Sequence, residues 1–207
     1  MRSSRTLLLV GIAAVALALG LSAGRALQAP APRALIGVTR LPAPRALPRL
    51  ALDGGAAALT TADLAGRWSV LFFGYTRCPD VCPTTLALLA KVVRRLADQP
   101  TARRPRVVFV SVDPARDPAA RVAEYARWFD AGFSGVTGSD ADLAVLTAAL
   151  GAPFARGTPD PTGAYAVDHS GALFILDPAV RFAAVMTPPL DAATLEHDLR
   201  VLLDEGP

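Results

Sequence analysis

Hydrophobic residues along positions 50–207 alternate between short continuous runs and runs with helical spacing. The runs 68–73 and 106–112 are almost entirely apolar, and the second is rich in valine. Both are typical of buried parallel strands. Apolar residues then recur every three or four positions over 83–98 and over about 117–129, which predicts two amphipathic helices. The order strand, helix, strand, helix indicates a parallel sheet with helical crossovers.

The remaining pattern predicts two more helices and a hairpin. A polar start and a Gly-Ala-Pro end bound a helix predicted over 139–150. Residues 164–167 predict a short strand, and the apolar runs 172–176 and 180–186 flank an Asp-Pro turn, as in a hairpin. Leucines with helical spacing predict a last helix over 191–203. The folded part of the chain is therefore expected to be an α/β domain.

The first 24 residues have the pattern of a membrane anchor or an export signal. Two arginines in residues 1–6 precede residues 7–24, which carry no charge. As a helix, this apolar run would be ~27 Å long, close to the ~30 Å hydrocarbon core of a bilayer. The length favours an uncleaved anchor, and the small residues 22–24 offer a cleavage site as the alternative. In both cases the basic flank places the rest of the chain outside the cytoplasm.

Residues 25–49 are rich in proline, arginine and alanine. Such a composition buries no core and favours extended conformations, so we expect a tether here. The predicted organisation is an anchor or signal segment over 1–24, a tether over 25–49 and one folded domain over 50–207.

The charge of the chain is divided unevenly. Residues 1–50 contain seven arginines and no acidic residue, which leaves 14 basic against 18 acidic side chains in residues 51–207, a net charge of −4. The basic character of the chain thus belongs to its N-terminal segment. Because nucleic-acid binding needs a basic face on the folded part, we expect no nucleic-acid partner.

Cys78 and Cys82 are the only cysteines, and they lie between the predicted strand and the helix that follows it. A disulfide between residues so close in sequence closes a short loop and would add only ~2 kcal/mol of stability. A functional pair is therefore favoured over a structural disulfide. The helix N-terminus is expected to lower their pKa values. Thiol exchange and soft-metal binding both remain open, and the spacing, wider than Cys-x-x-Cys, favours a metal such as Cu(I).

Two histidines could complete a metal site. His197 lies in the predicted last helix, off its apolar face, and is expected to be a solvated surface residue. His169 lies in a short turn at a strand end, where a ligand and an ordinary loop histidine are equally compatible with the pattern. A zinc site using both histidines is a further alternative, although the spacing of a zinc finger is absent.

Four blocks of this sequence resemble the Sco/SenC family in order and spacing: FGYTRCPDVCPTT at 73–85, SVDPARD at 111–117, TG at 137–138 and VDHS at 167–170. The resemblance covers residues 50–205. It implies a thioredoxin-like α/β fold, with a central mixed sheet flanked by helices, on an N-terminal membrane anchor. It also implies that Cys78, Cys82 and His169 bind copper, and that the protein helps to assemble the binuclear copper site of cytochrome c oxidase subunit II. One departure is Val180, where such proteins often have the glycine of an Asp-Pro-x-Gly turn.

Asp113 follows the second buried strand, at the edge where an α/β sheet places its site residues. Its carboxylate could orient His169 or a thiol from outside the ligand set. Equally, it could cap the turn formed by residues 114–117.

The leading hypothesis is a copper chaperone rather than an enzyme. Two thiolates and one imidazole would hold Cu(I), and also tolerate Cu(II), before the metal passes to subunit II or a similar acceptor. The domain would act on the extracytoplasmic, periplasmic side of the cytoplasmic membrane. The alternatives are a thiol-disulfide oxidoreductase that uses Cys78 and Cys82 as its redox pair to reduce the acceptor, and a redox or copper sensor.

Overall fold

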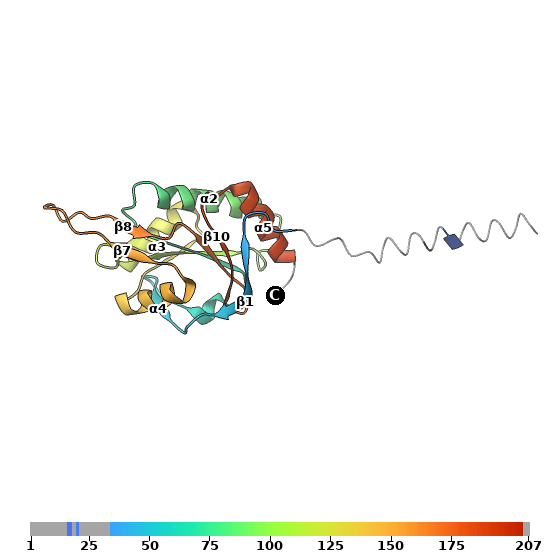
Figure 1. The fold of residues 1–207 in the computed structure, drawn as a ribbon, viewed down its shortest axis with the longest axis horizontal. Coiled ribbons are helices and arrows are strands. Elements are labelled where there is room, and N and C mark those ends of the chain that lie inside the picture. Colours follow the sequence, from blue (N-terminus) through green and yellow to red (C-terminus); the bar gives the residue numbers. More distant parts are fainter. Residues whose placement is uncertain (1–15, 18–19, 21–33, 205–207) are drawn as a thin grey trace, which may run out of the picture. The chain divides into compact units, whose positions relative to one another are not determined.

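A six-stranded mixed sheet lies at the centre of the computed structural model (Figure 1). The structure describes residues 16, 17, 20 and 34–204. The strands of this sheet are β1 (Thr39–Ala46), β4 (Ser69–Gly74), β5 (Arg106–Ser111), β6 (Ser134–Val136), β9 (Leu173–Leu176) and β10 (Arg181–Met186). Their spatial order is β1-β10-β9-β4-β5-β6. β4, β5 and β6 are parallel, whereas β9 runs antiparallel to both β4 and β10. The expected mixed sheet is confirmed.

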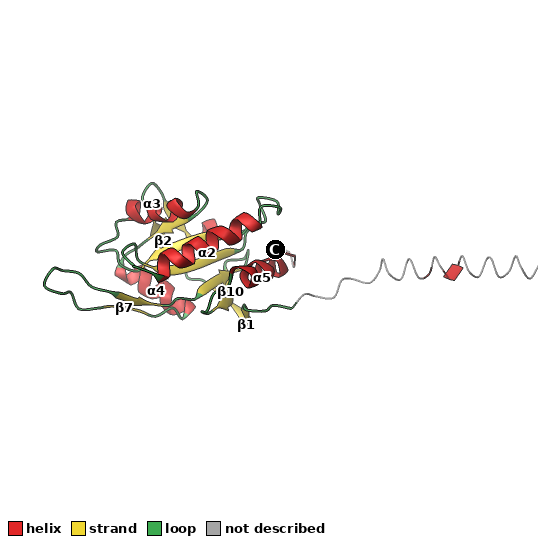
Figure 2. Cartoon of the chain, turned by 90° about the horizontal axis from the view of Figure 1, so that it is seen from above, coloured by secondary structure: helices red, strands yellow, loops and turns green. Residues whose placement is uncertain are grey.

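Helices cover both faces of the sheet (Figure 2). One face packs against α2 (Val81–Arg95), α3 (Ala119–Phe129) and α5 (Ala192–Asp204). The other face packs against α4 (Asp140–Leu150), the 3-10 helix η1 (Thr61–Leu64) and the small sheet of β2 (Ala51–Asp53) and β3 (Ala58–Thr60). Successive side chains of a strand point to opposite faces, so Phe72 enters the first core and Phe73 the second. This two-sided burial explains the unbroken apolar run of β4.

The strand that carries His169 differs from its prediction. The expected strand over 164–167 is instead β8 (Val167–His169), which pairs antiparallel with β7 (Phe154–Arg156) in a separate two-stranded sheet. Phe154 lies opposite His169 in this pairing. Strand β7 gives no clear alternating pattern in the sequence, so the register of β8 was not predictable. His169 consequently lies at the end of a strand and not in the turn after it.

Part of the predicted tether is a strand at the edge of the main sheet. β1 pairs antiparallel with β10 and is mostly exposed, with an irregularity between Arg40 and Arg45 that contains both of its prolines. Edge strands and bulges are the places where a sheet tolerates proline. Because this strand contributes little to the core, its composition resembles that of a linker. The folded unit therefore begins near residue 34 and not at residue 50.

The predicted anchor over 1–24 and the tether residues 25–33 lie outside the described residues, apart from 16, 17 and 20. Within the described ranges, no helix has the length and apolar character needed to cross a membrane.

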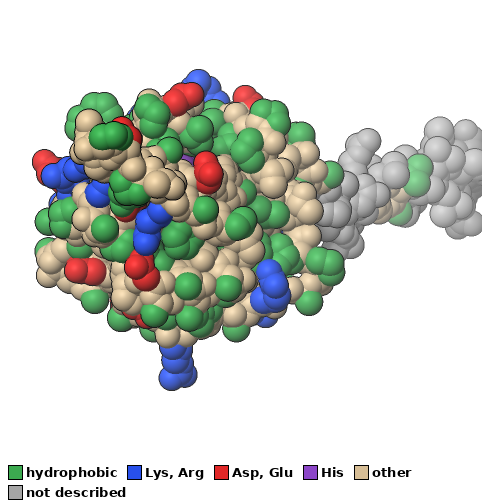
Figure 3. All heavy atoms as spheres, turned by 60° about the vertical axis from the view of Figure 1, so that its left-hand side comes forward, with side chains coloured by type: hydrophobic (Ala, Val, Ile, Leu, Met, Phe, Trp, Pro, Cys, Tyr) green, Lys and Arg blue, Asp and Glu red, His purple; other side chains and the backbone are tan. Residues whose placement is uncertain are grey.

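Figure 3 brings the side of β7 and β8 forward and shows basic and acidic side chains interspersed on that face.

A buried carboxylate attaches the N-terminal end of the folded unit to α5. Asp198 is fully buried and accepts backbone hydrogen bonds from Ile36 and Gly37, both at 2.8 Å, and from Val38 at 2.7 Å. His197 Nδ1 lies 3.0 Å from the same carboxylate, and its ring is half-exposed at the surface, as predicted. Burial acts to raise the pKa of Asp198, but the hydrogen bonds from His197 and the three amides outweigh burial and lower the pKa.

We expect Asp198→Asn to lower the free energy of unfolding by about 2–4 kcal/mol at pH 7, because an amide cannot accept all of these hydrogen bonds. The folded-state pKa is depressed, so the stabilisation by Asp198 is present above the unfolded pKa of about 3.9 and is lost as the pH falls through the folded-state value. Urea unfolding at pH 7 and pH 3 measures both effects. Glu124→Gln, an exposed change on α3, is the control, and an equal loss in the two variants would contradict this role.

The turn between β9 and β10 contains a valine in a left-handed conformation. Val180 has φ 60°, at the position where the Sco/SenC pattern often has glycine. A β-branched residue in this region is unusual, and the left-handed conformation costs about 1–2 kcal/mol for an L-residue. Val180 nevertheless packs against the second core cluster, which partly offsets the strain.

We expect Val180→Gly to be more stable than Ala179→Gly by about 1 kcal/mol, although it removes the larger and more buried side chain. Glycine relieves strain only at residue 180, because Ala179 does not have a positive φ. Thermal unfolding of the two variants beside the wild type measures the difference. Greater stability of Ala179→Gly would show that the packing of Val180 outweighs its strain.

Candidate metal centre

The two cysteines lie where β4 ends and α2 begins. β4 ends at Gly74, residues 75–80 turn, and α2 starts at Val81, two residues before the predicted start. Cys78 therefore lies in the turn and Cys82 in the first turn of the helix. Pro83 still lies in that first turn, where a missing backbone N–H costs nothing.

The sulfur of Cys82 occupies space that only a glycine at position 74 leaves free. A Cβ atom on Gly74 would lie 2.5 Å from Cys82 Sγ and 2.9 Å from Phe109 Cε2. Both distances are shorter than van der Waals contact, so a larger residue would displace the sulfur. Gly74 thus ends the strand and makes room for the buried thiol.

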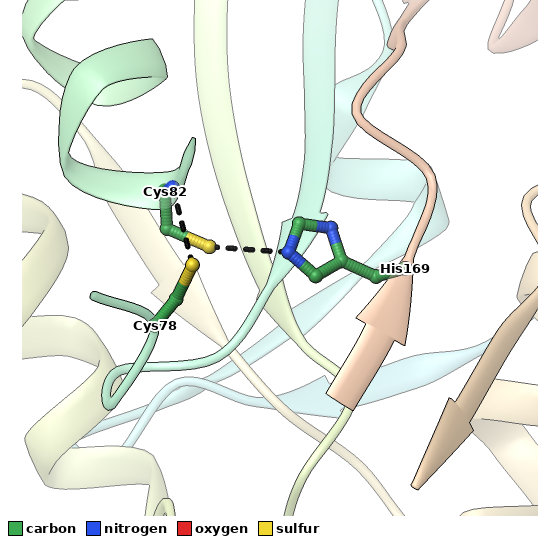
Figure 4. A group of neighbouring side chains, drawn as sticks. All are labelled: Cys78, Cys82 and His169. Atoms are coloured by element: carbon green, nitrogen blue, oxygen red, sulfur yellow. Dashed lines mark hydrogen bonds between the residues drawn. The ribbon is translucent and has the colours of Figure 1, made fainter. Parts of the chain in front are cut away.

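Cys78, Cys82 and His169 converge from the turn, the helix and strand β8 (Figure 4). Their ligand atoms all lie within 4.8 Å of one another. Cys82 Sγ is 3.5 Å from His169 Nε2, and the backbone N–H of Cys82 donates to Cys78 Sγ at 3.4 Å. Both cysteines are free thiols. His197, the other histidine, is not part of this group.

The ring of His169 is oriented by its neighbours. Its Nδ1 lies 3.2 Å from the carbonyl oxygen of Ser170, so the tautomer protonated at Nδ1 donates there and leaves the Nε2 lone pair facing the thiols. Phe72 and Tyr75 pack their rings edge-on against the imidazole, each with centroids 6.0 Å away. This arrangement is suited to metal binding through Nε2.

The two thiols differ in exposure. Cys82 is fully buried, whereas Cys78 and His169 are partly exposed. Burial raises the pKa of Cys82, a backbone hydrogen bond from Tyr75 opposes this effect, and Cys78 and Asp117 add to it. The expectation of a lowered pKa is therefore wrong for Cys82, because burial disfavours the thiolate. A metal that binds here has to displace the Cys82 proton.

Asp113 does not orient His169 or a thiol directly. Its fully buried carboxylate accepts from Arg116 Nε at 2.5 Å and from the Tyr165 hydroxyl at 2.7 Å. The side chain does not cap the following turn either, since the amides of Arg116 and Asp117 donate to the backbone carbonyl of Asp113. The carboxylate instead forms a salt bridge with Arg116.

Asp117 is a site residue that the sequence pattern did not reveal. It is fully buried and accepts from the Thr76 amide at 2.7 Å, from the Thr76 hydroxyl at 2.5 Å and from the Ser111 hydroxyl at 2.6 Å. These contacts join the cysteine turn to the end of β5. Because Asp117 precedes a proline, the sequence indicated only the start of a helix. No local pattern showed that the carboxylate of Asp117 is buried.

The donor set fits a soft metal ion. A trigonal site with bonds of about 2.0–2.3 Å separates its ligand atoms by about 4 Å, so small side-chain movements would suffice to close this group around an ion. Two sulfurs and one imidazole nitrogen favour Cu(I) and zinc over hard cations.

Comparison with known proteins agrees with this geometry. The model of the SCO1/SenC family matches residues 51–204. A protein of Stutzerimonas stutzeri that is named for copper binding is 38% identical over 168 residues, which are 81% of each chain. The human mitochondrial SCO2 homolog is 37% identical over 127 residues, or 61% of this chain and 48% of the human protein. The chain thus spans about half the length of this mitochondrial relative.

A solved structure shows the same fold. The copper-bound structure of ScoI from Bradyrhizobium japonicum superposes with a TM-score of 0.66 at 30% sequence identity, and covers 75% of this chain and 98% of that one. The central mixed sheet with its flanking helices is therefore the thioredoxin-like fold of the Sco structures.

We expect iodoacetamide to modify Cys78 at least about tenfold faster than Cys82 in the reduced, metal-free protein at pH 8, because burial keeps Cys82 protonated and inaccessible. Peptide mass spectrometry after timed quenching measures both rates. In urea the two cysteines should react at similar rates, which serves as the control. Equal rates in the folded protein would contradict the burial of Cys82.

Proposed function

The chain belongs to the SCO1/SenC family, and we propose that it is a copper chaperone that binds copper through Cys78, Cys82 and His169. The observation that carries this proposal is the convergence of two sulfurs and one imidazole nitrogen from three separate segments. These ligands suit Cu(I) and also tolerate Cu(II). The copper-bound relatives of the same fold support the choice of metal.

The uneven exposure of the ligands suits a protein that gives its metal away. Cys78 and His169 are partly exposed, so the ligands of an acceptor can approach the copper ion from their side. Cys82 is fully buried and cannot be approached from solvent. Transfer would proceed by stepwise exchange, in which Cys78 and His169 are replaced first and Cys82 last.

The proposed acceptor is the binuclear copper site of cytochrome c oxidase subunit II during oxidase assembly. The domain would reach it from the extracytoplasmic side of the cytoplasmic membrane, held by the apolar segment 7–24 with its basic flank. Digestion of the domain by protease in spheroplasts tests this placement, and protection in intact spheroplasts would exclude it.

Reduction of the acceptor cysteines is a second candidate function. Cys78 and Cys82 are free, adjacent thiols, and the backbone N–H of Cys82 already points at Cys78 Sγ. A thiol reductase needs both cysteines but not His169. Histidine substitution therefore separates the two functions.

We expect the wild-type protein to bind one copper ion per chain, and His169→Ala to weaken copper binding by at least about tenfold, because one of three ligands is lost. Competition with a chromophoric Cu(I) chelator measures the affinity. His197→Ala is the matched control, since it removes the other histidine at a distance from the site. Unchanged affinity in His169→Ala would exclude the three-ligand site.

The same variant in cells separates delivery from reduction. Loss of oxidase assembly in a His169→Ala strain, with thiol exchange retained, would support copper delivery. Normal assembly in that strain would support reduction instead.

A further inference from the structure

His169 is carried by a hairpin that is not hydrogen-bonded into the main sheet. β7 and β8 form a two-stranded sheet of their own, and the loop that joins them extends away from the rest of the domain (Figures 1 and 2). The backbone ladder of the main sheet therefore does not set the position of His169. Side-chain contacts between the hairpin and the sheet have to do so.

Two arginines make contacts of this kind. Arg156 of β7 donates to the carbonyl oxygen of Val112 through Nε and Nη2, and Arg116 holds the segment that leads into β8. From the turn after β5, its Nε donates to Asp113 Oδ2 and its Nη1 donates to the carbonyl oxygen of Tyr165 at 2.8 Å. The guanidinium carbon lies 3.3 Å from the centroid of the Tyr165 ring. The Tyr165 hydroxyl completes the triangle by donating to Asp113 Oδ1. The segment that leads into β8 is thus tied to the end of β5.

Tyr75 extends these contacts to the imidazole. The Arg116 guanidinium lies 5.7 Å from the centroid of the Tyr75 ring. The edge-on contact between Tyr75 and His169 completes the path. Arg116 therefore acts both on the backbone before β8 and on a ring that touches the ligand.

We propose that Arg116 is a positioning residue that holds His169 over the two thiols. Its role requires a planar group that donates hydrogen bonds in two directions while it stacks on an aromatic ring, and lysine cannot do this. The inference rests on the proposed function insofar as His169 is a copper ligand. The placement of the hairpin can also be measured without copper.

The test is a double-mutant cycle on copper affinity with Arg116→Met and His169→Ala. We expect Arg116→Met to weaken Cu(I) binding by about tenfold, in the range seen when residues that orient metal ligands are changed. Arg116→Lys should lose nearly as much, because charge alone does not restore the stacked geometry. In the His169→Ala background, Arg116→Met should have no further effect. Arg121→Met, at an exposed arginine of α3, is the matched control and should bind copper as the wild type does.

Hydrogen exchange of the metal-free protein gives an independent measurement. We expect faster exchange of the β8 amides in Arg116→Met and, to a smaller extent, in Tyr165→Phe, which removes only the hydroxyl contact to Asp113. The Tyr165 variant keeps the test valid if Arg116→Met does not fold. Unchanged exchange in β8 in both variants would overturn the proposal.

The outcomes separate this inference from the proposed function. Equal losses of affinity from Arg116→Met with and without His169 would show a general structural role and overturn the inference, as would wild-type affinity in Arg116→Met. Absence of copper binding by the wild type would refute the proposed function alone, because hydrogen exchange in β8 would still report on how Arg116 holds the hairpin.

Discussion

The structure depends on the burial of the Cys82 sulfur against the end of β4. No atom beyond hydrogen fits on the Cα of Gly74 without displacing this sulfur, so strand, turn and helix meet at one close contact. Cys78 then follows from the turn, and His169 has to come from elsewhere in the chain to face the pair. Burial also raises the pKa of the Cys82 thiol, so a metal that binds through this sulfur would have to release its proton.

Buried carboxylates join the segments that this contact leaves unconnected. Asp117 connects the turn of Cys78 to the end of β5. Asp113 binds Arg116, which also donates to the segment before β8. Asp198 connects residues 36–38 to α5. Each is fully buried, and each accepts several hydrogen bonds. A buried charge is tolerated only when it is satisfied in this way. Loss of a partner should therefore affect the arrangement of whole segments.

For the proposed copper chaperone, this arrangement would combine firm binding of the metal with its release. The deepest ligand lies on a helix packed into the core, whereas the imidazole lies on a separate hairpin held by polar and stacking contacts. A copper ion would thus be bound between a rigid element and one whose attachment is local. This difference is consistent with stepwise exchange in which the buried thiolate leaves last.

The sequence by itself determined the α/β class, the strand-turn-helix around Cys78 and Cys82, and the family resemblance, because apolar periodicity and motif spacing are local properties of the chain. The VDHS block pointed to His169 through the resemblance, but the apolar pattern left its role open, and only the tertiary structure shows how strand β8, paired with β7, places its ring beside the thiols. It also decided that burial raises the pKa of Cys82, that Asp113 faces Arg116, and that a proline-rich segment forms an edge strand. Desolvation and long-range pairing arise from residues distant in sequence, so no local pattern encodes them.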